Sequence, residues 1–353
     1  MHSREIVFQK WDEKAAMWAR HLEQHGYRCA GLQGSAAYAP LVLLRTVFRS
    51  GRPAAYVFRY LSDYPGLAKT LARTFSEVVT AFVAYCSGIR ILWIMHNLDR
   101  ESAQNWPAIS RLRRGIVGKL AHACFVTDPL MVEQARALYP DYQWRSLSFG
   151  VEADRGRRDP TMEVVVAAAH KLRDDLARRL GKNKTIYIGL CFTSMSEKCV
   201  HLFRYRELLA LGGSSDFLLG LVFVGDFSGA GEKWRRIAEE ISGYEGAMVI
   251  DESCSFDEAN ISPHFDFFYR SLIDISMPYS VYRAAACGLP IITHPVGFCG
   301  EIVKEYGVGY VVSGDDDTGA GEFLKNWNKE AWSDFLSRRS WEKAAETFAR
   351  VVS

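Results

Sequence analysis

One stretch of the chain, residues 266–312, alternates apolar runs with short helical segments. The apolar runs are Ile273–Met277, Leu289–Thr293 and Tyr310–Val312. A segment of small residues that ends at Gly288 separates the first two runs. A glycine-bearing turn and a short helical segment around Glu301 separate the second run from the third. The order strand, helix, strand, helix, strand is typical of a parallel sheet. Such sheets bind ligands at the carboxyl ends of their strands, which here carry Tyr279 and Ser280.

The same alternation runs through the rest of the chain and predicts two doubly wound α/β domains. In the first half, strands are expected at 6–9, 27–32, 54–58, 89–95, 123–126 and 146–149, with helices at 13–24, 67–85, 108–122 and 130–138. In the second half, strands are expected at 186–190, 217–224 and 247–250, with helices at 162–180, 200–211, 232–242 and 330–352. The polar segment Glu152–Thr161 is interpreted as the linker between the domains.

Length and composition agree with a globular protein of two domains. The chain has 353 residues, of which 48% are hydrophobic and 24% charged. No apolar run approaches the roughly 20 residues that span a bilayer, and the amino terminus has no apolar signal core. The eight cysteines form neither a CxxC pair nor a zinc spacing. These features together predict a reduced, cytoplasmic location.

Charge is distributed unevenly along the chain. Residues 1–155 contain 20 Lys and Arg against 13 Asp and Glu, a net charge of +7, whereas the remainder has a net charge of −5. The basic half suggests an anionic partner, for which a membrane surface, a diphosphate-linked lipid and a nucleic acid are candidates. No nucleic-acid-binding motif accompanies the charge, so nucleic acid is not expected.

Basic and aromatic residues are interleaved in this half, as at a membrane interface. The basic residues are Arg45, Arg49, Arg52, Arg59, Arg111, Arg113, Arg114 and Lys119, and the aromatic ones are Phe48, Tyr56, Phe58 and Tyr60. They suggest peripheral binding to an anionic membrane surface on the cytoplasmic side. The alternative is a set of solvated charges with the aromatic side chains in the core.

The stretch 266–312 resembles the donor-binding half of GT-B-fold glycosyltransferases, in particular family 4 and bacterial exopolysaccharide glycosyltransferases. The similarity lies in an apolar run ending in Pro-Tyr-Ser, a helix ending in Ala-Cys-Gly, the run Leu-Pro-Ile-Ile, and a glycine-rich turn followed by Glu-Ile-Val. The resemblance implies two Rossmann-like domains facing a central cleft. Residues 1–155 would bind the acceptor and residues 156–330 the nucleotide-sugar donor. Residues 331–353 would form a helix that crosses back to the first domain.

The donor site must hold a nucleotide diphosphate, which needs a helix amino terminus and a cation. The helix expected to start at Ser280 provides the first, and Lys198 is the cation candidate. Family members commonly have Glu-Lys-Gly at this point, with the lysine on the diphosphate. Glu197 and Lys198 match that motif, although Cys199 stands where glycine is usual. Further donor-binding candidates are Gly225, Asp226, Tyr279, Arg283 and Glu301.

The chain departs from family 4 at its paired glutamates. Arg283 occupies the position of the second glutamate, and the first has no counterpart. A guanidinium can contact phosphate but cannot accept hydrogen bonds from ribose hydroxyls. Ribose recognition is therefore unassigned, and the loss of the glutamates favours inversion over retention. Asp226, Asp251 and Glu252 are substitutes at strand ends, with a turn role as the alternative.

In the first domain a buried strand ends in His96-Asn97-Leu98-Asp99-Arg100-Glu101. Comparable His-Asn pairs follow this strand in bacterial exopolysaccharide glycosyltransferases. An inverting transfer needs a base for the acceptor hydroxyl, and Asp99 and Glu101 are the favoured candidates. His96 would position the substrate or stabilise charge. A plain helix cap by Asn97 or Asp99 is the alternative.

The resulting hypothesis is a glycosyltransferase that moves a sugar from a UDP or GDP sugar to a glycan. The acceptor would be a lipid-linked oligosaccharide in exopolysaccharide synthesis. Neither a cofactor nor a metal is expected, since no Asp-x-Asp pair stands at a suitable site. Two alternatives remain open: a sugar-nucleotide 2-epimerase of the same fold, and a non-catalytic GT-B scaffold protein.

Overall fold

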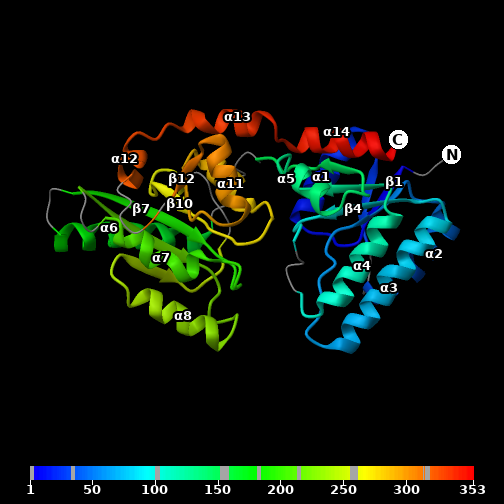
Figure 1. The fold of residues 1–353 in the computed structure, drawn as a ribbon, viewed down its shortest axis with the longest axis horizontal. Coiled ribbons are helices and arrows are strands. Elements are labelled where there is room, and N and C mark those ends of the chain that lie inside the picture. Colours follow the sequence, from blue (N-terminus) through cyan, green and yellow to red (C-terminus); the bar gives the residue numbers. More distant parts are fainter. Residues whose placement is uncertain are drawn as a thin grey trace. The chain divides into compact units, whose positions relative to one another are not determined.

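The protein forms two compact units (Figure 1). The computed structural model describes residues 4–32, 36–99, 104–151, 159–180, 184–212, 216–254, 261–312, 314 and 319–353. Unit 1 comprises Met1–Gly150, Ile275–Met277 and Arg339–Ser353. Unit 2 comprises Val151–Asp274 and Pro278–Arg338. Each unit therefore contains segments that are distant in sequence.

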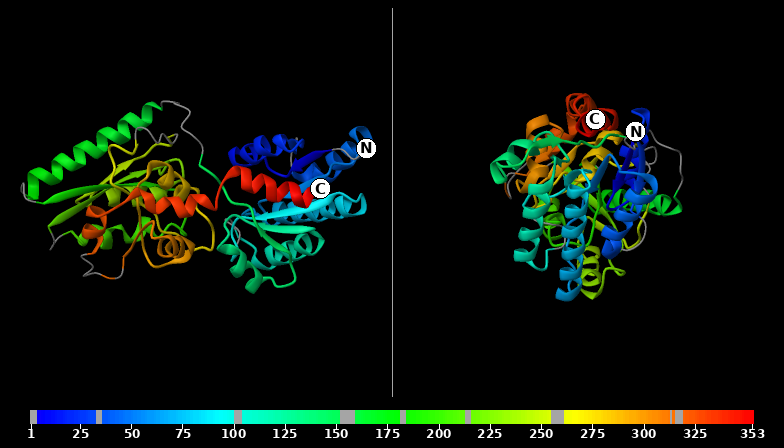
Figure 2. Two further views of the ribbon diagram at one scale, coloured as in Figure 1. Left: turned by 90° about the horizontal axis from the view of Figure 1, so that it is seen from above. Right: turned by 90° about the vertical axis from the view of Figure 1, so that its right-hand side faces the viewer.

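The described part of unit 1 has a six-stranded parallel sheet in the order β2-β1-β3-β4-β5-β6. Its strands are β1 (Glu5–Phe8), β2 (Arg28–Gly31), β3 (Ala55–Phe58), β4 (Arg90–Met95), β5 (Ala123–Val126) and β6 (Trp144–Ser146). Its helices are α1 (Glu13–Gln24), α2 (Ala39–Ser50), α3 (Leu67–Cys86), α4 (Pro107–Leu120), α5 (Met131–Leu138) and α14 (Trp341–Val352), with the 3₁₀ turn η1 (Ala36–Tyr38). Helices α2, α3 and α4 lie side by side on one face, and α1 packs with α14 on the other (Figure 2).

The described part of unit 2 has a second six-stranded parallel sheet, ordered β12-β11-β10-β7-β8-β9. Its strands are β7 (Thr185–Phe192), β8 (Phe217–Val224), β9 (Ala247–Ile250), β10 (Phe267–Tyr269), β11 (Ile291–Thr293) and β12 (Gly309–Val311). Its helices are α6 (Pro160–Leu180), α7 (His201–Ala210), α8 (Glu232–Ser242), α10 (Tyr279–Cys287), α11 (Gly297–Tyr306), α12 (Gly319–Lys325) and α13 (Trp332–Ser337), with the 3₁₀ turn η2 (Lys329–Ala331). Every residue of β8 is buried, as expected for a strand covered on both faces.

The strand expected at Ile273–Met277 is wrong. The strand that pairs with β7 and β11 is β10, which ends at Tyr269, so the apolar run lies beyond the carboxyl edge of the sheet. There Leu272 forms an isolated antiparallel bridge with Cys199, and Ser276 forms one with Asn97. Within the run, Asp274, Ser276 and Met277 are buried, whereas Ile273 is 44% exposed.

The single helix expected over 330–352 is also wrong. It is divided into η2, α13 and α14, with a break at residues 338–340. The break arises because Ser340 caps α14, its hydroxyl accepting a hydrogen bond from Lys343 N at 3.1 Å, while Arg339 turns inward to Asp128. Strand β6 ends at Ser146, whereas the sequence placed it at 146–149. Helix α2 has no counterpart among the expected elements.

Five residues assigned to a membrane-facing surface are buried instead. They are Tyr56, Phe58, Arg59, Arg113 and Arg114. The two aromatic residues lie in β3, which is buried along its whole length. Arg113 donates to Asp63 at 2.8 Å, and Arg114 donates to the Asn97 carbonyl at 3.0 Å. Both guanidinium groups therefore form hydrogen bonds inside the unit and do not face solvent. No described helix combines the length and the apolar composition that crossing a bilayer requires.

Candidate functional site

Lys198 lies at the carboxyl edge of the unit 2 sheet, in the segment between β7 and α7. Its Nζ is 3.1 Å from Oδ2 of Asp274, and its side chain retains 21% exposure, whereas that of Asp274 retains 1%. The backbone carbonyl of Asp274 accepts a hydrogen bond from Phe298 N, in the first turn of α11, at 3.2 Å. Asp274 therefore joins a partly exposed cation to a helix amino terminus, two features that attract anions.

The amino terminus of α11 depends on a glycine. Gly297 has φ +61°, and a Cβ at this position would lie 1.9 Å from the Leu272 carbonyl oxygen. Only glycine allows the helix to start so close to the Leu272 backbone. The preceding residue, Val296, gives no side-chain cap to the helix. Backbone N–H groups in the first turn therefore have no side-chain acceptor at the N-cap.

A second cation, Arg270, follows β10 at the same edge. Its Nη1 donates to the Phe192 carbonyl at 2.7 Å and lies 3.5 Å from His201 Nε2. His201 is buried, and burial together with Arg270 holds its pKa well below the usual range. Its Nδ1 is 2.8 Å from the Ser271 carbonyl and its Nε2 is 2.9 Å from Thr193 Oγ1. A neutral ring can donate through Nδ1 and accept from Thr193, which fixes the loops after β7 and β10.

The candidates after β8 form a local turn. A Cβ on Gly225 would lie 2.5 Å from Met195 Cε, so glycine allows close packing against the segment after β7. Asp226 is exposed and accepts from Gly229 N at 2.8 Å. Asp251 accepts from Phe227 N at 2.6 Å and from Ser228 N at 3.0 Å. Both aspartates thus order the loop that follows β8.

The candidates on α10 and α11 are arranged around two helix starts. Helix α10 begins at Tyr279, one residue before the expected start at Ser280. The buried Ser280 hydroxyl oxygen has no hydrogen-bond partner among the described residues. Arg283 lies one turn further on, with its guanidinium carbon 5.6 Å from the centre of the Tyr279 ring. Glu301 is exposed on α11.

In unit 1, His96 follows β4 and is enclosed by aromatic rings. It stacks on Tyr60 with 4.6 Å between ring centroids and an 8° interplanar angle, and Phe149 lies 6.3 Å away. Burial, with Arg59 and two lysines nearby, lowers the pKa of His96 well below its usual range. The lowered pKa favours the neutral ring, which suits positioning of a substrate better than stabilisation of negative charge.

A polar cluster that the sequence did not assign surrounds His96. Asp12 follows β1 and forms an ion pair with Arg59, Nη1 to Oδ1, at 2.5 Å. The Tyr60 hydroxyl donates to the other Asp12 oxygen at 3.2 Å, and Arg59 Nη2 is 3.4 Å from His96 Nε2. Burial alone would raise the pKa of Asp12, but the hydrogen bond and charge of Arg59 lower it. Lys10 lies over the Tyr60 ring at 4.9 Å, so the cluster has excess positive charge.

The other catalytic candidates are placed differently. Asp99 is exposed, and its Oδ1 accepts from Ile275 N at 3.3 Å. Glu101 lies outside the described residues. Asn97 is buried next to Ser276 through the antiparallel bridge. The strand end thus contacts the segment 275–277, which the sequence had assigned to the second domain.

Among the described residues, no three His, Cys, Asp or Glu side chains gather in a way that could hold a metal ion.

No protein-family model matches the chain, and no curated protein matches it. Several solved structures do. HepE from Anabaena, in complex with UDP and glucose, aligns over 99% of both chains with 12% identity and a TM-score of 0.62.

Two further structures show the same architecture. The lipopolysaccharide outer core galactosyltransferase WaaB aligns over 99% of both chains with 11% identity and a TM-score of 0.58. A putative UDP-N-acetylglucosamine 2-epimerase from Listeria monocytogenes aligns over 99% of this chain and 95% of its own, with 12% identity and a TM-score of 0.53. The fold is GT-B.

Within the GT-B fold, the residues that sequence reasoning missed all follow strands. Arg59 and Tyr60 come directly after β3 and Arg270 directly after β10, whereas Asp12 ends the loop that follows β1 and caps α1. A polar residue after each apolar run was the available signal. Asp274 was concealed because it lies inside the run that was interpreted as a strand.

Acid should destabilise unit 2 through His294, whose side chain is buried at the end of β11. Its Nε2 is 2.9 Å from the Tyr269 hydroxyl, and burial, with Arg204 nearby, lowers its pKa to about 4. An unfolded histidine has a pKa of about 6.5, so between about pH 4 and this value the unfolded chain binds a proton that the folded chain does not. The free energy of unfolding should therefore fall as the pH drops through about 6.5, by up to about 2 kcal/mol at pH 5.

Urea unfolding at pH 7 and pH 5 measures this loss. His294→Gln should reduce the difference between the two pH values, whereas His25→Gln, at an exposed position, should leave it unchanged. An equal pH dependence in the parent and in His294→Gln would contradict the assignment.

Proposed function

We propose that the protein is a glycosyltransferase that moves a sugar from a nucleotide diphosphate sugar to a glycan acceptor. The observation that supports this most is the arrangement of Lys198, Asp274 and the α11 amino terminus at the carboxyl edge of the unit 2 sheet. In open α/β sheets this edge is where ligands bind. The GT-B fold is shared with HepE, whose crystal structures are described as complexes with UDP, with UDP and glucose, and with UDP-glucose.

In this proposal the donor diphosphate binds at Lys198 and the N–H groups of α11. Arg270 adds a second positive charge at the same edge, and Arg283 is a third cation, on α10. Positive charge and aligned N–H groups stabilise the leaving diphosphate as negative charge develops on it. Asp274 holds Lys198 in place rather than binding the donor, because its carboxylate is buried and would repel phosphate. Gly225, Asp226, Tyr279, Ser280 and Glu301 remain donor-binding candidates.

The acceptor binds, in the same proposal, at the carboxyl edge of the unit 1 sheet. Arg59 and Lys10 give this edge a positive charge that suits an acceptor carrying phosphate, such as a lipid-linked oligosaccharide. Asp99 and Glu101 are the base candidates for the acceptor hydroxyl. His96 positions the acceptor as a neutral ring, since its lowered pKa leaves it uncharged. Exopolysaccharide synthesis in a bacterium is the process that we assign to this reaction.

Nucleotide binding tests the donor half of the proposal. We expect UDP at millimolar concentration to raise the melting temperature, with GDP, ADP and CMP having less effect. A ligand at 100 times its Kd stabilises by about 2.7 kcal/mol, which is measurable by thermal shift. If GDP alone raised the melting temperature, the transferase proposal would stand and the donor would be a GDP sugar. A flat panel would contradict the donor site and favour a non-catalytic scaffold.

A second function, sugar-nucleotide epimerisation, is favoured by the likeness to the putative UDP-N-acetylglucosamine 2-epimerase. An epimerase converts one bound sugar nucleotide and needs no acceptor. Incubation with UDP-N-acetylglucosamine alone, followed by NMR of the sugar, distinguishes the two reactions. We expect no conversion without acceptor; formation of the 2-epimer would replace the transferase proposal.

A further inference from the structure

Helix α3 is oriented with its apolar side away from the sheet. The large apolar residues at its exposed positions are Leu67, Leu71, Phe75, Phe82 and Tyr85. Phe75 is 73% exposed and Phe82 is 61% exposed, although a helix on a sheet normally buries such side chains. Its buried positions carry mainly hydroxyl groups, one carboxylate and alanines: Thr70, Thr74, Ser76, Glu77, Thr80, Ala81 and Ala84.

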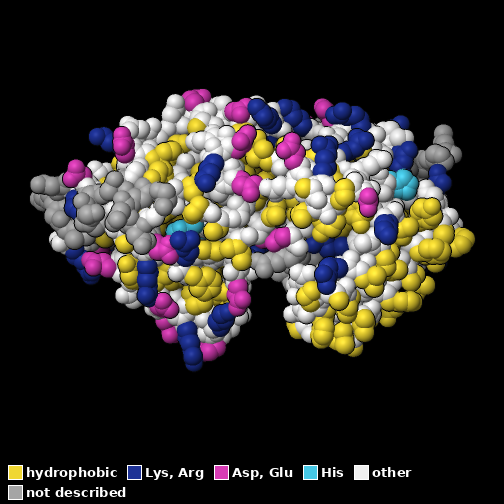
Figure 3. All heavy atoms as spheres, in the orientation of Figure 1, with side chains coloured by type: hydrophobic (Ala, Val, Ile, Leu, Met, Phe, Trp, Pro, Cys, Tyr) yellow, Lys and Arg dark blue, Asp and Glu magenta, His cyan; other side chains and the backbone are white. Residues whose placement is uncertain are grey.

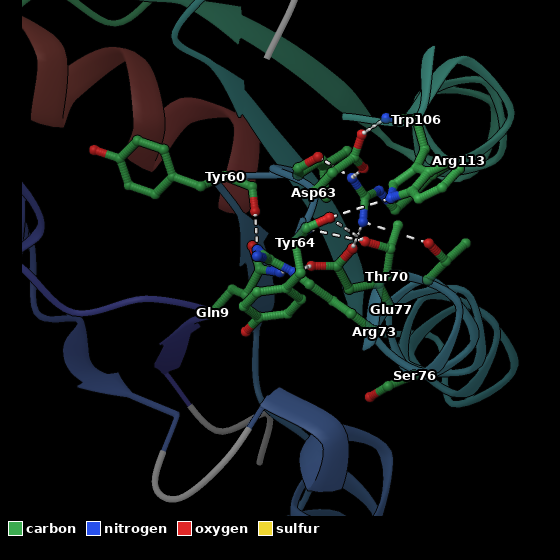
Figure 4. A network of polar contacts seen from close by, with 12 residues as sticks. Gln9, Tyr60, Asp63, Tyr64, Thr70, Arg73, Ser76, Glu77, Trp106 and Arg113 are labelled. Atoms are coloured by element: carbon green, nitrogen blue, oxygen red, sulfur yellow. Dashed lines mark hydrogen bonds and ion pairs between the residues drawn. The ribbon is translucent and has the colours of Figure 1, made fainter. Parts of the chain in front are cut away.

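The inward polar side of α3 is satisfied by a network that fixes this orientation (Figure 4). Glu77 accepts from Gln9 at 2.7 Å and from Arg73 at 2.9 Å, and it pairs with Arg113 at 3.2 Å. Arg113 also pairs with Asp63 at 2.8 Å. Rotating α3 to bury its phenylalanines would leave these buried charges without partners, which is strongly destabilising. The apolar side is thus held outward by the packing of the unit.

Neighbouring helices extend the exposed apolar side into one surface, which we name the three-helix face. Its apolar members are Leu41 and Phe48 on α2, Leu71, Phe75, Phe82 and Tyr85 on α3, and Leu112 on α4. Phe48 is the most exposed of them, at 84%. Figure 3 shows hydrophobic side chains gathered over the region where Figure 1 places these three helices. Single exposed apolar residues are ordinary, but a contiguous patch marks an interaction surface.

The charges on the three-helix face have one sign. The exposed charged residues of α2, α3 and α4 are Arg45, Arg49, Lys69, Arg111 and Lys119. All residues of these three helices are described, and they include one carboxylate, Glu77, which is buried in the network. Surfaces that bind anionic bilayers typically combine phenylalanine and leucine with arginine and lysine, and they lack exposed carboxylates.

We infer that the three-helix face docks on an anionic lipid bilayer. Its phenylalanines enter the acyl boundary, and Arg45 and Arg49, on the same helix as Phe48, contact lipid phosphate groups. An acidic protein partner would match the charge equally, but the row of phenylalanines along α3 matches the apolar layer beneath the headgroups. Docking would bring unit 1 to the surface where a lipid-linked acceptor resides. The inference stands on the helices alone and does not depend on the nucleotide-sugar proposal.

Flotation with vesicles tests the inference without any nucleotide. We expect the full chain to bind phosphatidylcholine vesicles that contain 30% phosphatidylglycerol, and to bind pure phosphatidylcholine at least ~10-fold more weakly. Phe75→Ser with Phe82→Ser should lower the partition coefficient at least ~10-fold. Arg45→Gln with Arg49→Gln should lower it about 25-fold, at about fivefold for each charge, and high salt should act in the same direction.

A matched control removes two exposed lysines from unit 2, with Lys171→Gln and Lys325→Gln, and should leave binding unchanged. Circular dichroism of each variant shows that loss of binding is not loss of fold. Absence of binding to anionic vesicles would overturn the inference. So would a dimer in solution that dissociates in the Phe75→Ser, Phe82→Ser variant, because the face would then join two copies of the chain. The flotation assay contains no UDP. A failure to bind vesicles would therefore leave the proposed donor site, which the thermal-shift assay tests, unaffected.

Discussion

Lys198→Ala should lower kcat/KM with the sugar donor by about 100-fold to 1000-fold, the usual loss when one group that stabilises developing negative charge is removed. Lys198 is the partly exposed cation that Asp274 holds beside the α11 amino terminus. Without it, the leaving diphosphate loses a direct charge partner. Steady-state kinetics with UDP-glucose, together with the melting temperature in UDP, measure both the turnover and the binding.

Three variants separate this role from a structural one. Lys198→Arg retains the charge and should keep a larger share of the activity than Lys198→Ala. Lys233→Ala removes an exposed lysine that pairs with the adjacent Glu197, and should change kcat/KM by less than about twofold. Lys198→Ala leaves the buried Asp274 unpaired, so adding Asp274→Asn should restore stability but not activity. Full activity of Lys198→Ala would refute the assigned role.

Arg339→Ala should lower the free energy of unfolding of unit 1 by about 3–5 kcal/mol, as expected when one partner of a buried ion pair is removed. Arg339 contacts Asp128 with two hydrogen bonds, at 2.7 and 2.9 Å, and both side chains are completely buried. The pair attaches the segment before α14 to the end of β5. Hydrogen exchange of peptides from α14 in increasing urea reports this unit separately from unit 2.

The neighbouring Arg338 provides the control for this loss. Its ion pair with Asp334, at 3.3 Å, is exposed, so Arg338→Ala should change stability by less than about 0.5 kcal/mol. Replacing both buried partners, with Arg339→Met and Asp128→Leu, should recover most of the loss, because no unpaired charge remains. A loss below 1 kcal/mol in Arg339→Ala would show that the pair does not hold α14.

Strands and helices with strong local patterns were predictable. The bounds of β8, α8 and β9 agree with the sequence expectation, because continuous apolar runs and a clear helical period define them. The alternation predicted two doubly wound domains, and the resemblance at 266–312 implied the GT-B fold. Helix α2 was missed, and β10 was misplaced into a longer apolar run. A three-residue strand carries too little periodic pattern to be recognised beside a longer run.

The candidate site was predictable only in part. Lys198 could be named because it follows a strand in a motif that resembles a family, but Asp274 is 76 residues further along the chain and reaches it only in the folded protein. The same holds for Asp12 and Arg59, which come from the loop after β1 and from the end of β3. Ligand-binding residues in such folds come together at a sheet edge, and strand order decides which ends are adjacent.

The sequence by itself determined the alternation of elements, the two parallel sheets and the presence of a long helix at 67–85. The tertiary structure alone decided which side of α3 faces the sheet. A helical period distinguishes two faces but does not orient them. Here Gln9 and Arg113, from two other parts of the chain, partner Glu77 on the polar side, and Asp63 in turn pairs with Arg113. Burying charge without partners costs more than exposing phenylalanine, so the apolar side faces outward.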